Sequence, residues 1–319
     1  KKAKERMRLS EYITIHSKLS EYFNAVYYSK ERKFSDSGLV KINDVVEILE
    51  KNKSYYHKYY PNIWALYLIY YAIEDSGNYK RVQSLTKYIK DNENNFTQEF
   101  LQFSYDALLR IIFTKVNSGN NKAFEDFYRI TLSLVSRGIL ERIQHIQPRL
   151  FVGIITVCVN SNNIKLAEKI IKKYSNKISL LLRNQVSKIA ISVVELSKGN
   201  YREVKRLLAN EKPKDSMLNI FCKSTLIKAY YESRDYKFIY PLSDTLKHYL
   251  KRRNDTAELL ESVSKFLSYT GKLAKIRKKK CLGLDYLEFE LMNENYFFQK
   301  KWVVKQVDNI KHNKMSKNC

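Results

Sequence analysis

Six short polar turns recur along this chain of 319 residues, and their spacing constrains the fold more than any other feature of the sequence. They are centred on Gly77, Gly119, Asn162, Gly199, Arg234 and Gly271, at intervals of 42, 43, 37, 35 and 37 residues. Closing two antiparallel helices over a few residues requires one residue in the left-handed region, which Gly reaches freely and Asn tolerates. Such spacing is typical of repeated helical hairpins. We therefore expect these turns to be the corners of helix pairs.

The sequences on either side of the turns support this prediction. A helix-length apolar segment precedes each turn, and a shorter, more basic segment follows it. Before the second turn, apolar residues recur at steps of three and four: Phe100, Phe103, Ala107, Leu108 and Ile111. Between pairs, Pro148 and Pro213 cannot continue a helix. Ser216 and Asp255 are expected to cap the helices that follow.

The residue after the centre of a turn is expected to complete the corner. An Asn or Asp there accepts a hydrogen bond from the exposed amides that begin the second helix. Asn200, after Gly199, is the clearest case. Arg234 departs from the pattern, being neither Gly nor Asn, and we expect a different turn geometry there. These corners need no ligand, and each has a single glycine, whereas a phosphate-binding loop needs several clustered amides.

Two of the repeats resemble a known family. The stretch KAYYESRDYKFI places Ala229, Tyr230, Tyr231, Asp235 and Tyr236 much as the tetratricopeptide-repeat family places its residues around the hairpin turn. The stretch NIKLAEKII is similar to that family's second helix, with Ala167 at the small position and Ile171 at the bulky one. The resemblance implies an all-α fold, a right-handed α-solenoid of antiparallel helix hairpins with degenerate repeats.

The ends of the chain differ from its middle. We expect helices capping the solenoid in residues 1–60, five to six hairpins in 61–280, and capping helices and a tail in 281–319. The N-terminal part predicts one basic helix and a second from Val40 to about Tyr60. The C-terminal part predicts two short helices whose apolar residues are Leu284, Tyr286, Leu287 and Phe289, then Phe298, Trp302, Val303 and Val307. Capping is the expected role, because the ends of a solenoid expose apolar surface.

Composition excludes several classes of protein. Eight Gly and four Pro are too few for an all-β sandwich or barrel with its many tight turns. The cysteines Cys158, Cys222, Cys281 and Cys319 form no close pair, so we expect neither a disulfide framework nor a zinc site, and we predict a cytoplasmic protein. No apolar run reaches the roughly 18 residues needed to span a bilayer.

The sequence contains none of the usual catalytic or cofactor-binding motifs, whether for phosphates, dinucleotides, zinc peptidases or serine hydrolases. The five histidines never lie three or four residues from another His or Cys, as a local metal site would require. We therefore predict a protein that is not an enzyme and that uses no cofactor or metal.

Helical-hairpin arrays present the first helices of their pairs on an inner surface. Polar residues of these helices are the predicted protein-binding or peptide-binding set: Asn184, Lys188, Asn219, Lys223 and Lys228. The family resemblance implies that Asn219 and Lys223 are half of a clamp for a peptide's terminal carboxylate. The aromatic stretch Ser54–Trp64 is interpreted as helix packing, with a recognition surface as the alternative.

The net charge of +25 favours acidic partners, although a lysine-rich composition alone also produces it. Residues 247–280 contain eleven basic and three acidic residues. The predicted polyanion-binding set is Lys251, Arg252, Arg253, Lys275, Arg277, Lys278, Lys279 and Lys280. Tyr249 and Tyr269 are close enough in sequence to stack on bases. Solvated helix ends are the alternative, since cations also offset the helix dipole.

Two functions follow from these patterns. The first is a non-enzymatic interaction or scaffold module that holds a partner on the solenoid surface. The alternative is a nucleic-acid-associated helical-repeat protein that uses the basic residues of 247–280, whose binding would weaken steeply with salt. A subunit of a larger assembly with no ligand of its own is a third.

Overall fold

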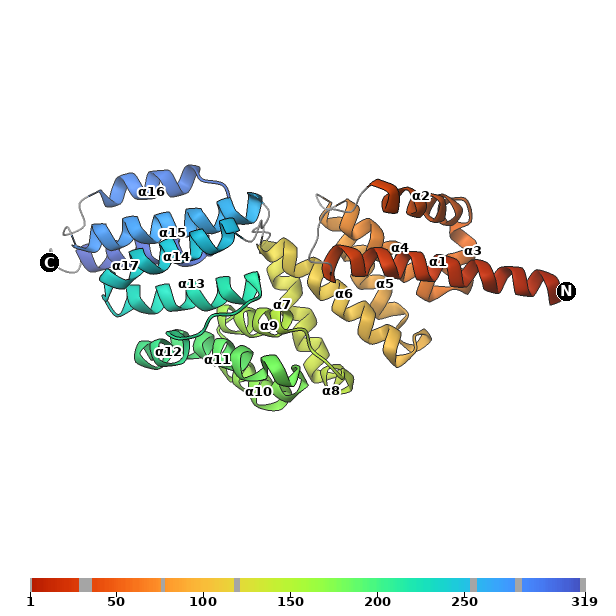
Figure 1. Ribbon diagram of the computed structural model, residues 1–319, viewed down its shortest axis with the longest axis horizontal. Coiled ribbons are helices and arrows are strands. Elements are labelled where there is room, and N and C mark those ends of the chain that lie inside the picture. The colour runs from red at the N-terminus through yellow and green to blue at the C-terminus, as the bar shows by residue number, and fades with distance from the viewer. Residues whose placement is uncertain are drawn as a thin grey trace. The chain divides into compact units, whose positions relative to one another are not determined.

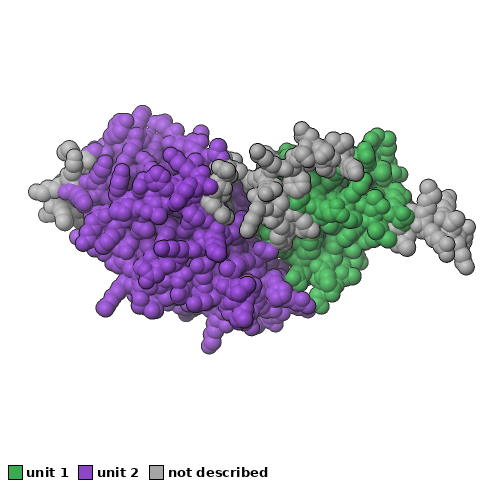
Figure 2. All heavy atoms as spheres, in the orientation of Figure 1, with its two compact units in different colours: residues 1–112 green, residues 113–319 purple. Residues whose placement is uncertain are grey.

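The computed structural model describes residues 2–28, 36–75, 78–117, 121–252, 257–278 and 283–315. Within these residues every regular element is helical, with seventeen α-helices, three short 3₁₀ helices and no strand (Figure 1). The predicted all-α class is therefore confirmed. The chain divides into two compact units, residues 1–112 and 113–319, which Figure 2 colours separately. The division falls inside one helix, a place that the sequence did not indicate.

Unit 1 is built from six helices. They are α1 (Lys2–Tyr28), α2 (Asp36–Lys51), α3 (Lys53–Tyr59), α4 (Pro61–Glu74), α5 (Tyr79–Asp91) and the part of α6 (Gln98–Asn117) that ends at Ile112, with η1 (Glu93–Asn95) before α6. Helix α1 packs on α4 and α2, and α4 packs on α3 and α5. The predicted long N-terminal helix is present. The predicted second helix is two helices, α2 and α3, broken at Asn52.

Tyrosines fasten α4 to the other helices of unit 1. Glu50 accepts hydrogen bonds from the hydroxyls of Tyr67 and of Tyr71, the latter at 2.7 Å, and Lys53 Nζ lies 2.7 Å from the same carboxylate. The bonds from Lys53, Tyr67 and Tyr71 lower the pKa of Glu50 to about 2. Tyr56 is buried and donates to Glu11 at 2.8 Å. Within the aromatic stretch Ser54–Trp64, Tyr56 thus packs α3 against α1, whereas Tyr59 is 58% exposed.

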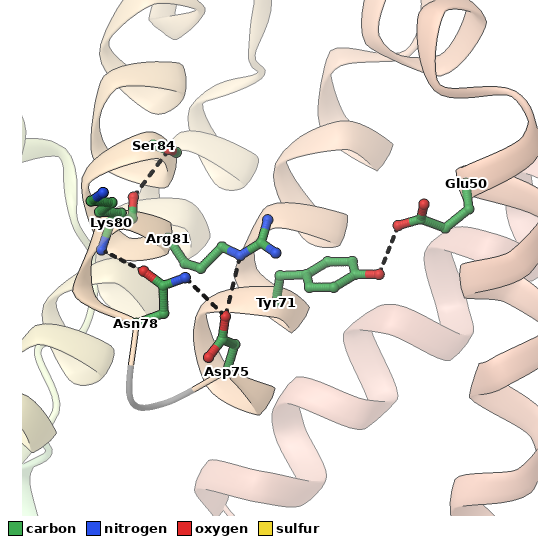
Figure 3. Close-up of polar contacts among 7 residues, drawn as sticks. All are labelled: Glu50, Tyr71, Asp75, Asn78, Lys80, Arg81 and Ser84. Carbon is green, nitrogen blue, oxygen red and sulfur yellow. Dashed lines mark hydrogen bonds and ion pairs between the residues drawn. The ribbon is translucent and has the colours of Figure 1, made fainter.

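The corner between α4 and α5 shows how such a turn closes (Figure 3). Asn78 accepts from the backbone amide of Lys80 at 3.2 Å and donates to Asp75 at 3.1 Å. Arg81 pairs with Asp75 at 3.4 Å, and its guanidinium lies 5.0 Å from the ring centre of Tyr71. The predicted capping by the Asn that follows Gly77 is therefore present. Gly77 and Gly119 themselves lie outside the described residues.

Unit 2 contains the end of α6 and eleven further helices. They are α7 (Asn121–Ser136), α8 (Ile139–Arg142), α9 (Pro148–Asn160), α10 (Ile164–Tyr174), α11 (Leu180–Ser197), α12 (Tyr201–Leu208), α13 (Ser216–Glu232), α14 (Ile239–Arg252), α15 (Ala257–Lys278), α16 (Leu284–Asn293) and α17 (Lys300–Met315), with η2 (Ser175–Lys177) and η3 (Tyr236–Phe238). From α9 to α15 each helix contacts the next, and α9, α11, α13 and α15 also contact one another in that order (Figure 1).

Three corners of unit 2 share one backbone geometry. Their centres Asn162, Gly199 and Arg234 have φ of 58°, 80° and 62°, all in the left-handed region. In each corner the amide of the following residue bonds to the carbonyl five residues earlier: Asn163 to Cys158 at 2.9 Å, Asn200 to Glu195 at 2.9 Å, and Asp235 to Tyr230 at 2.8 Å. This bond is the signature of the Schellman closure of a helix end. The predicted corners at 162 and 199 are confirmed.

The structure corrects two predictions about the corners. Arg234 adopts the same left-handed geometry as its counterparts, and not a different one. Gly271 lies inside the unbroken helix α15, so the sixth predicted corner is wrong. The residue that follows distinguishes the two cases. Asp235 follows Arg234 and accepts bonds from Ser233 and Lys205, whereas Lys272 follows Gly271 and pairs with Glu290 on α16.

The corners of unit 2 define one edge of the unit, and the links between successive pairs define the opposite edge. The corner edge contains Asn162, Gly199 and Arg234. The loop edge contains the link Ser175–Ser179 before α11 and the link Ala209–Asp215 before α13. The start of α9 also lies at this edge. Arg149 at the start of α9 pairs with Asp215 at 2.5 Å, which shows that these helix starts adjoin. Asp215 also caps α13 by accepting from Leu218, a role that the sequence assigned to Ser216.

Candidate interaction surface

Two of the predicted partner-binding lysines meet at Glu211, in the link between α12 and α13. Lys188 Nζ lies 2.6 Å from Glu211 Oε1, and Gln185 donates to the other oxygen at 3.1 Å. Lys223 donates to the backbone carbonyl of Glu211 at 3.1 Å. Burial raises the pKa of Glu211, but the bonds from Lys188 and Gln185 outweigh it and hold that pKa below its usual value. The Glu211 carboxylate therefore occupies Lys188, and the Glu211 backbone carbonyl occupies Lys223, one residue of the predicted clamp.

The other three members of this predicted set lie apart from that cluster. Asn184 is exposed near the start of α11. Asn219 is buried, and its Oδ1 has no hydrogen-bond partner among the described residues. Lys228 contacts the C-terminal part of unit 2. The five residues therefore do not form one open face, and their role in binding a partner stays a prediction.

Lys228 belongs to a half-buried polar cluster between α13 and α17. Its Nζ donates to Gln299 Oε1 at 2.5 Å and lies 5.7 Å from the ring centre of Trp302. Burial lowers the pKa of Lys228 to about 7, and the nearby Glu232 opposes the shift. Glu232 accepts from Gln306 at 2.6 Å. This cluster was not predictable from the sequence, because the two glutamines come 71 and 74 residues after their partners.

The predicted polyanion-binding residues fall into two groups at opposite ends of α15. Lys251 and Arg252 end α14 at the loop edge, whereas Lys275 and Lys278 are exposed at the corner edge. The 22 residues of α15 separate the groups by about 30 Å. Arg277 is half-buried, with its guanidinium 5.0 Å from the ring centre of Tyr231. Arg253, Lys279 and Lys280 lie outside the described residues. The single basic patch is therefore corrected to two separate groups.

The two tyrosines proposed to stack on bases are occupied within the protein. Tyr269 is 6% exposed, and its ring stacks on that of Phe297 at 5.1 Å between centres. Tyr249 is partly buried against the core, and its hydroxyl donates to the carbonyl of Lys214 at 2.8 Å. Packing of α15 and α14 against their neighbours therefore removes both rings from the surface that a base would need.

Helix α16 carries an apolar stripe on its outer face. Tyr286, Phe289 and Met292 are 68%, 66% and 75% exposed, at steps of three residues. The opposite face, with Leu284, Leu287 and Leu291, is buried in the core that α13 to α17 share. The two predicted C-terminal helices are present as α16 and α17, and the sequence did not distinguish the exposed Tyr286 and Phe289 from the buried Leu284 and Leu287. The sequence signal for this exposed face was that apolar residues occur on all sides of the short helix.

The described residues contain no group of three His, Cys, Asp or Glu side chains arranged to hold a metal. An open groove of about 350 Å³ runs along α1, lined by Tyr12, Ile13, His16, Ser17, Ser20 and Glu21. Burial lowers the pKa of His16 and raises the pKa of the Cys158 and Cys222 thiols to about 12. Both cysteines are free and buried, as predicted. No described helix is long and apolar enough to cross a membrane.

Comparison with models of protein families finds no match, and no curated protein or solved structure is significantly similar to this chain.

Proposed function

We propose that this protein is a non-enzymatic interaction module, an α-solenoid of helix hairpins resembling tetratricopeptide arrays, which binds a partner protein through the outer face of α16. The order of contacts in unit 2 supports the architecture. Each helix from α9 to α15 packs on the next, and the first helices of successive pairs also pack on one another. Stacked hairpins of a solenoid have these contacts.

The observation that carries the proposal is the exposure of Tyr286, Phe289 and Met292. Burying such a side chain is worth roughly 1.5 to 3 kcal/mol, so three exposed in a row on one helix form a surface that gains from a partner. Large contiguous apolar surfaces on a protein mark interaction sites. Aromatic residues and Met are also the side chains that protein interfaces favour.

The charge around the stripe indicates the chemistry of the partner. Residues 283–299 contain four acidic residues and no Lys or Arg, in a chain of net charge +25. Glu290 and Glu294 pair with Lys272 and Lys265 on α15, at 2.6 and 2.8 Å, and Glu288 pairs with Lys311 on α17. Asp285 stays exposed beside Tyr286. A nearly neutral, slightly acidic rim favours an apolar protein segment and disfavours a polyanion.

The nucleic-acid alternative is not proposed. Its basic residues fall into two groups, and both of its tyrosines are occupied. A cytoplasmic location stays a prediction.

Affinity purification from native cells tests the proposal. The double variant Tyr286→Ser, Phe289→Ser is expected to lose a partner that the unaltered protein recovers. Tyr240→Ser is the matched control, since Tyr240 is 80% exposed on a different helix, α14. Recovery of the same proteins by all three forms would refute the assignment to α16.

A further inference from the structure

Leucine side chains project from unit 2 into solvent at the turn between α10 and α11. Leu180 is 78% exposed, Leu181 is 96% exposed, and the next residue, Leu182, is 38% exposed. The turn lies at the lower margin of unit 2 in Figure 1, where α10 ends and α11 begins. A leucine exposed to this degree has almost none of its surface against the protein. These residues are far in sequence from the α16 stripe and belong to the loop edge.

The turn that presents these leucines is firmly held. Ile178, just before it, is 1% exposed. Arg183 donates to the carbonyls of Asn176 at 2.6 Å and Ile178 at 3.2 Å. Lys177 donates to the carbonyl of Ile143 at 2.6 Å, and its own carbonyl accepts from the amide of Ile146 at 3.0 Å. Since the backbone is fastened on both sides, Leu180 and Leu181 are held in solvent instead of folding back onto the protein.

Exposed cations lie along the same loop edge as the leucines. Lys172 is exposed near the end of α10, and Lys212 and Lys214 are exposed in the link before α13. Lys251 and Arg252 join them at the end of α14, which the bond from Tyr249 to the Lys214 carbonyl holds against that link.

The acidic residues of this edge do not neutralise those cations. Glu141 pairs with Lys173, Glu211 with Lys188, and Asp215 with Arg149. Each of these three carboxylates is therefore matched by a cation other than the five exposed ones. Among the described side chains of the links before α11 and α13, the loop edge keeps a positive excess beside an apolar projection.

We propose that the loop edge of unit 2 binds an anionic lipid surface, with Leu180 and Leu181 entering the membrane interface and the surrounding lysines and arginine meeting lipid phosphates. The two features require different environments that occur together at a membrane surface. Apolar side chains gain from the acyl boundary, and each nearby basic residue gains from the negative surface potential. A nucleic acid provides no apolar environment in which the leucines could be buried. Two projecting side chains also insert more readily into a deformable lipid surface than into a preformed protein groove.

Vesicle flotation with the full chain tests this inference. The protein is expected to bind vesicles of phosphatidylcholine mixed with phosphatidylserine, and to bind pure phosphatidylcholine at least about tenfold more weakly. Leu180→Ser, Leu181→Ser should weaken binding to the mixed vesicles by about tenfold or more, since both insertions are lost. Lys212→Glu, Lys214→Glu should weaken it and reduce its dependence on salt.

Controls separate this proposal from its alternatives. Tyr240→Ser removes an exposed aromatic residue from the start of α14 and should leave vesicle binding unchanged, and circular dichroism should show that every variant is folded. Absence of binding to the mixed vesicles would overturn the proposal. So would equal binding by the leucine variant, which would indicate charge attraction alone, or an equal loss in Tyr240→Ser, which would indicate unspecific apolar adhesion. A leucine variant that binds vesicles normally but loses a protein partner would assign the edge to that protein instead.

Discussion

At the scale of single residues, the residue after the turn centre predicts a corner better than the centre does. Asn163, Asn200 and Asp235 follow the three left-handed residues, and each side chain bonds locally, to Leu166, Glu195 and Ser233 respectively. Asn163 caps its helix as predicted, but Asn200 and Asp235 make no capping bond. Gly271 is followed by Lys272 instead of Asn or Asp, and it lies inside the unbroken helix α15. An Asn or Asp at that position can be recognised in the sequence. Glycine alone led to the wrong prediction of a corner at Gly271.

The two glycines make a matched pair for a stability measurement. Gly199 has φ of +80°, and an added Cβ would meet nothing closer than 3.9 Å, so the cost of Gly199→Ala is conformational. We expect the free energy of unfolding to fall by about 1 to 2 kcal/mol. Gly271 is helical with nothing within 4 Å of an added Cβ, so Gly271→Ala should raise it by about 0.5 to 1 kcal/mol. Denaturant unfolding measures both, and shifts of the same sign would contradict the assigned geometries.

At the scale of elements, the sequence predicted helices well and their contacts less well. The periodic apolar segments and the corners placed α9 to α14, because both signals are local. The cluster of Lys228 with Gln299 was not predictable, because it joins helices far apart in the chain and involves a glutamine with φ of 62°. The outer face of α16 was also missed, since an apolar residue does not reveal which face of a helix is covered.

The Lys228 cluster predicts a pH dependence of stability. Folding lowers the pKa of Lys228 from 10.5 to about 7, so between these values the unfolded chain binds more protons than the folded one. Lys228 therefore contributes a free energy of unfolding that rises with pH through this range, whereas the buried Cys158 and Cys222 thiols, whose pKa folding raises to about 12, contribute one that falls. We expect the Lys228 contribution to grow by about 3 kcal/mol between pH 7 and about pH 9.5. The difference in free energy of unfolding between the unaltered protein and Lys228→Met, followed by denaturant unfolding across that range, measures it.

Two variants isolate the contribution of Lys228. Because methionine does not titrate, the difference in free energy of unfolding between the unaltered protein and Lys228→Met should change by about 3 kcal/mol from pH 7 to about pH 9.5. Lys169→Met removes an exposed lysine of α10, and its difference from the unaltered protein should stay constant. A constant difference for Lys228→Met would contradict the lowered pKa of Lys228.

At the scale of the whole molecule, composition and repeats predicted an all-α chain, and the described residues are all helical or irregular. The boundary between the two compact units falls within α6, at Ile112, and no proline, glycine or polar stretch marks it in the sequence. The five predicted partner-binding residues do not share one open face, for a related reason. Helical spacing placed Lys188 and Lys223 correctly, but their partner Glu211 comes from a loop whose path depends on tertiary packing.

The most direct test of the proposed function is photo-crosslinking in native cells from a benzoylphenylalanine residue placed at position 289. The account predicts one recurrent cross-linked protein from position 289 and none of it from position 240, an equally exposed aromatic site on α14. No product at position 289, or the same products from both positions, would contradict the claim that α16 is where this protein binds its partner.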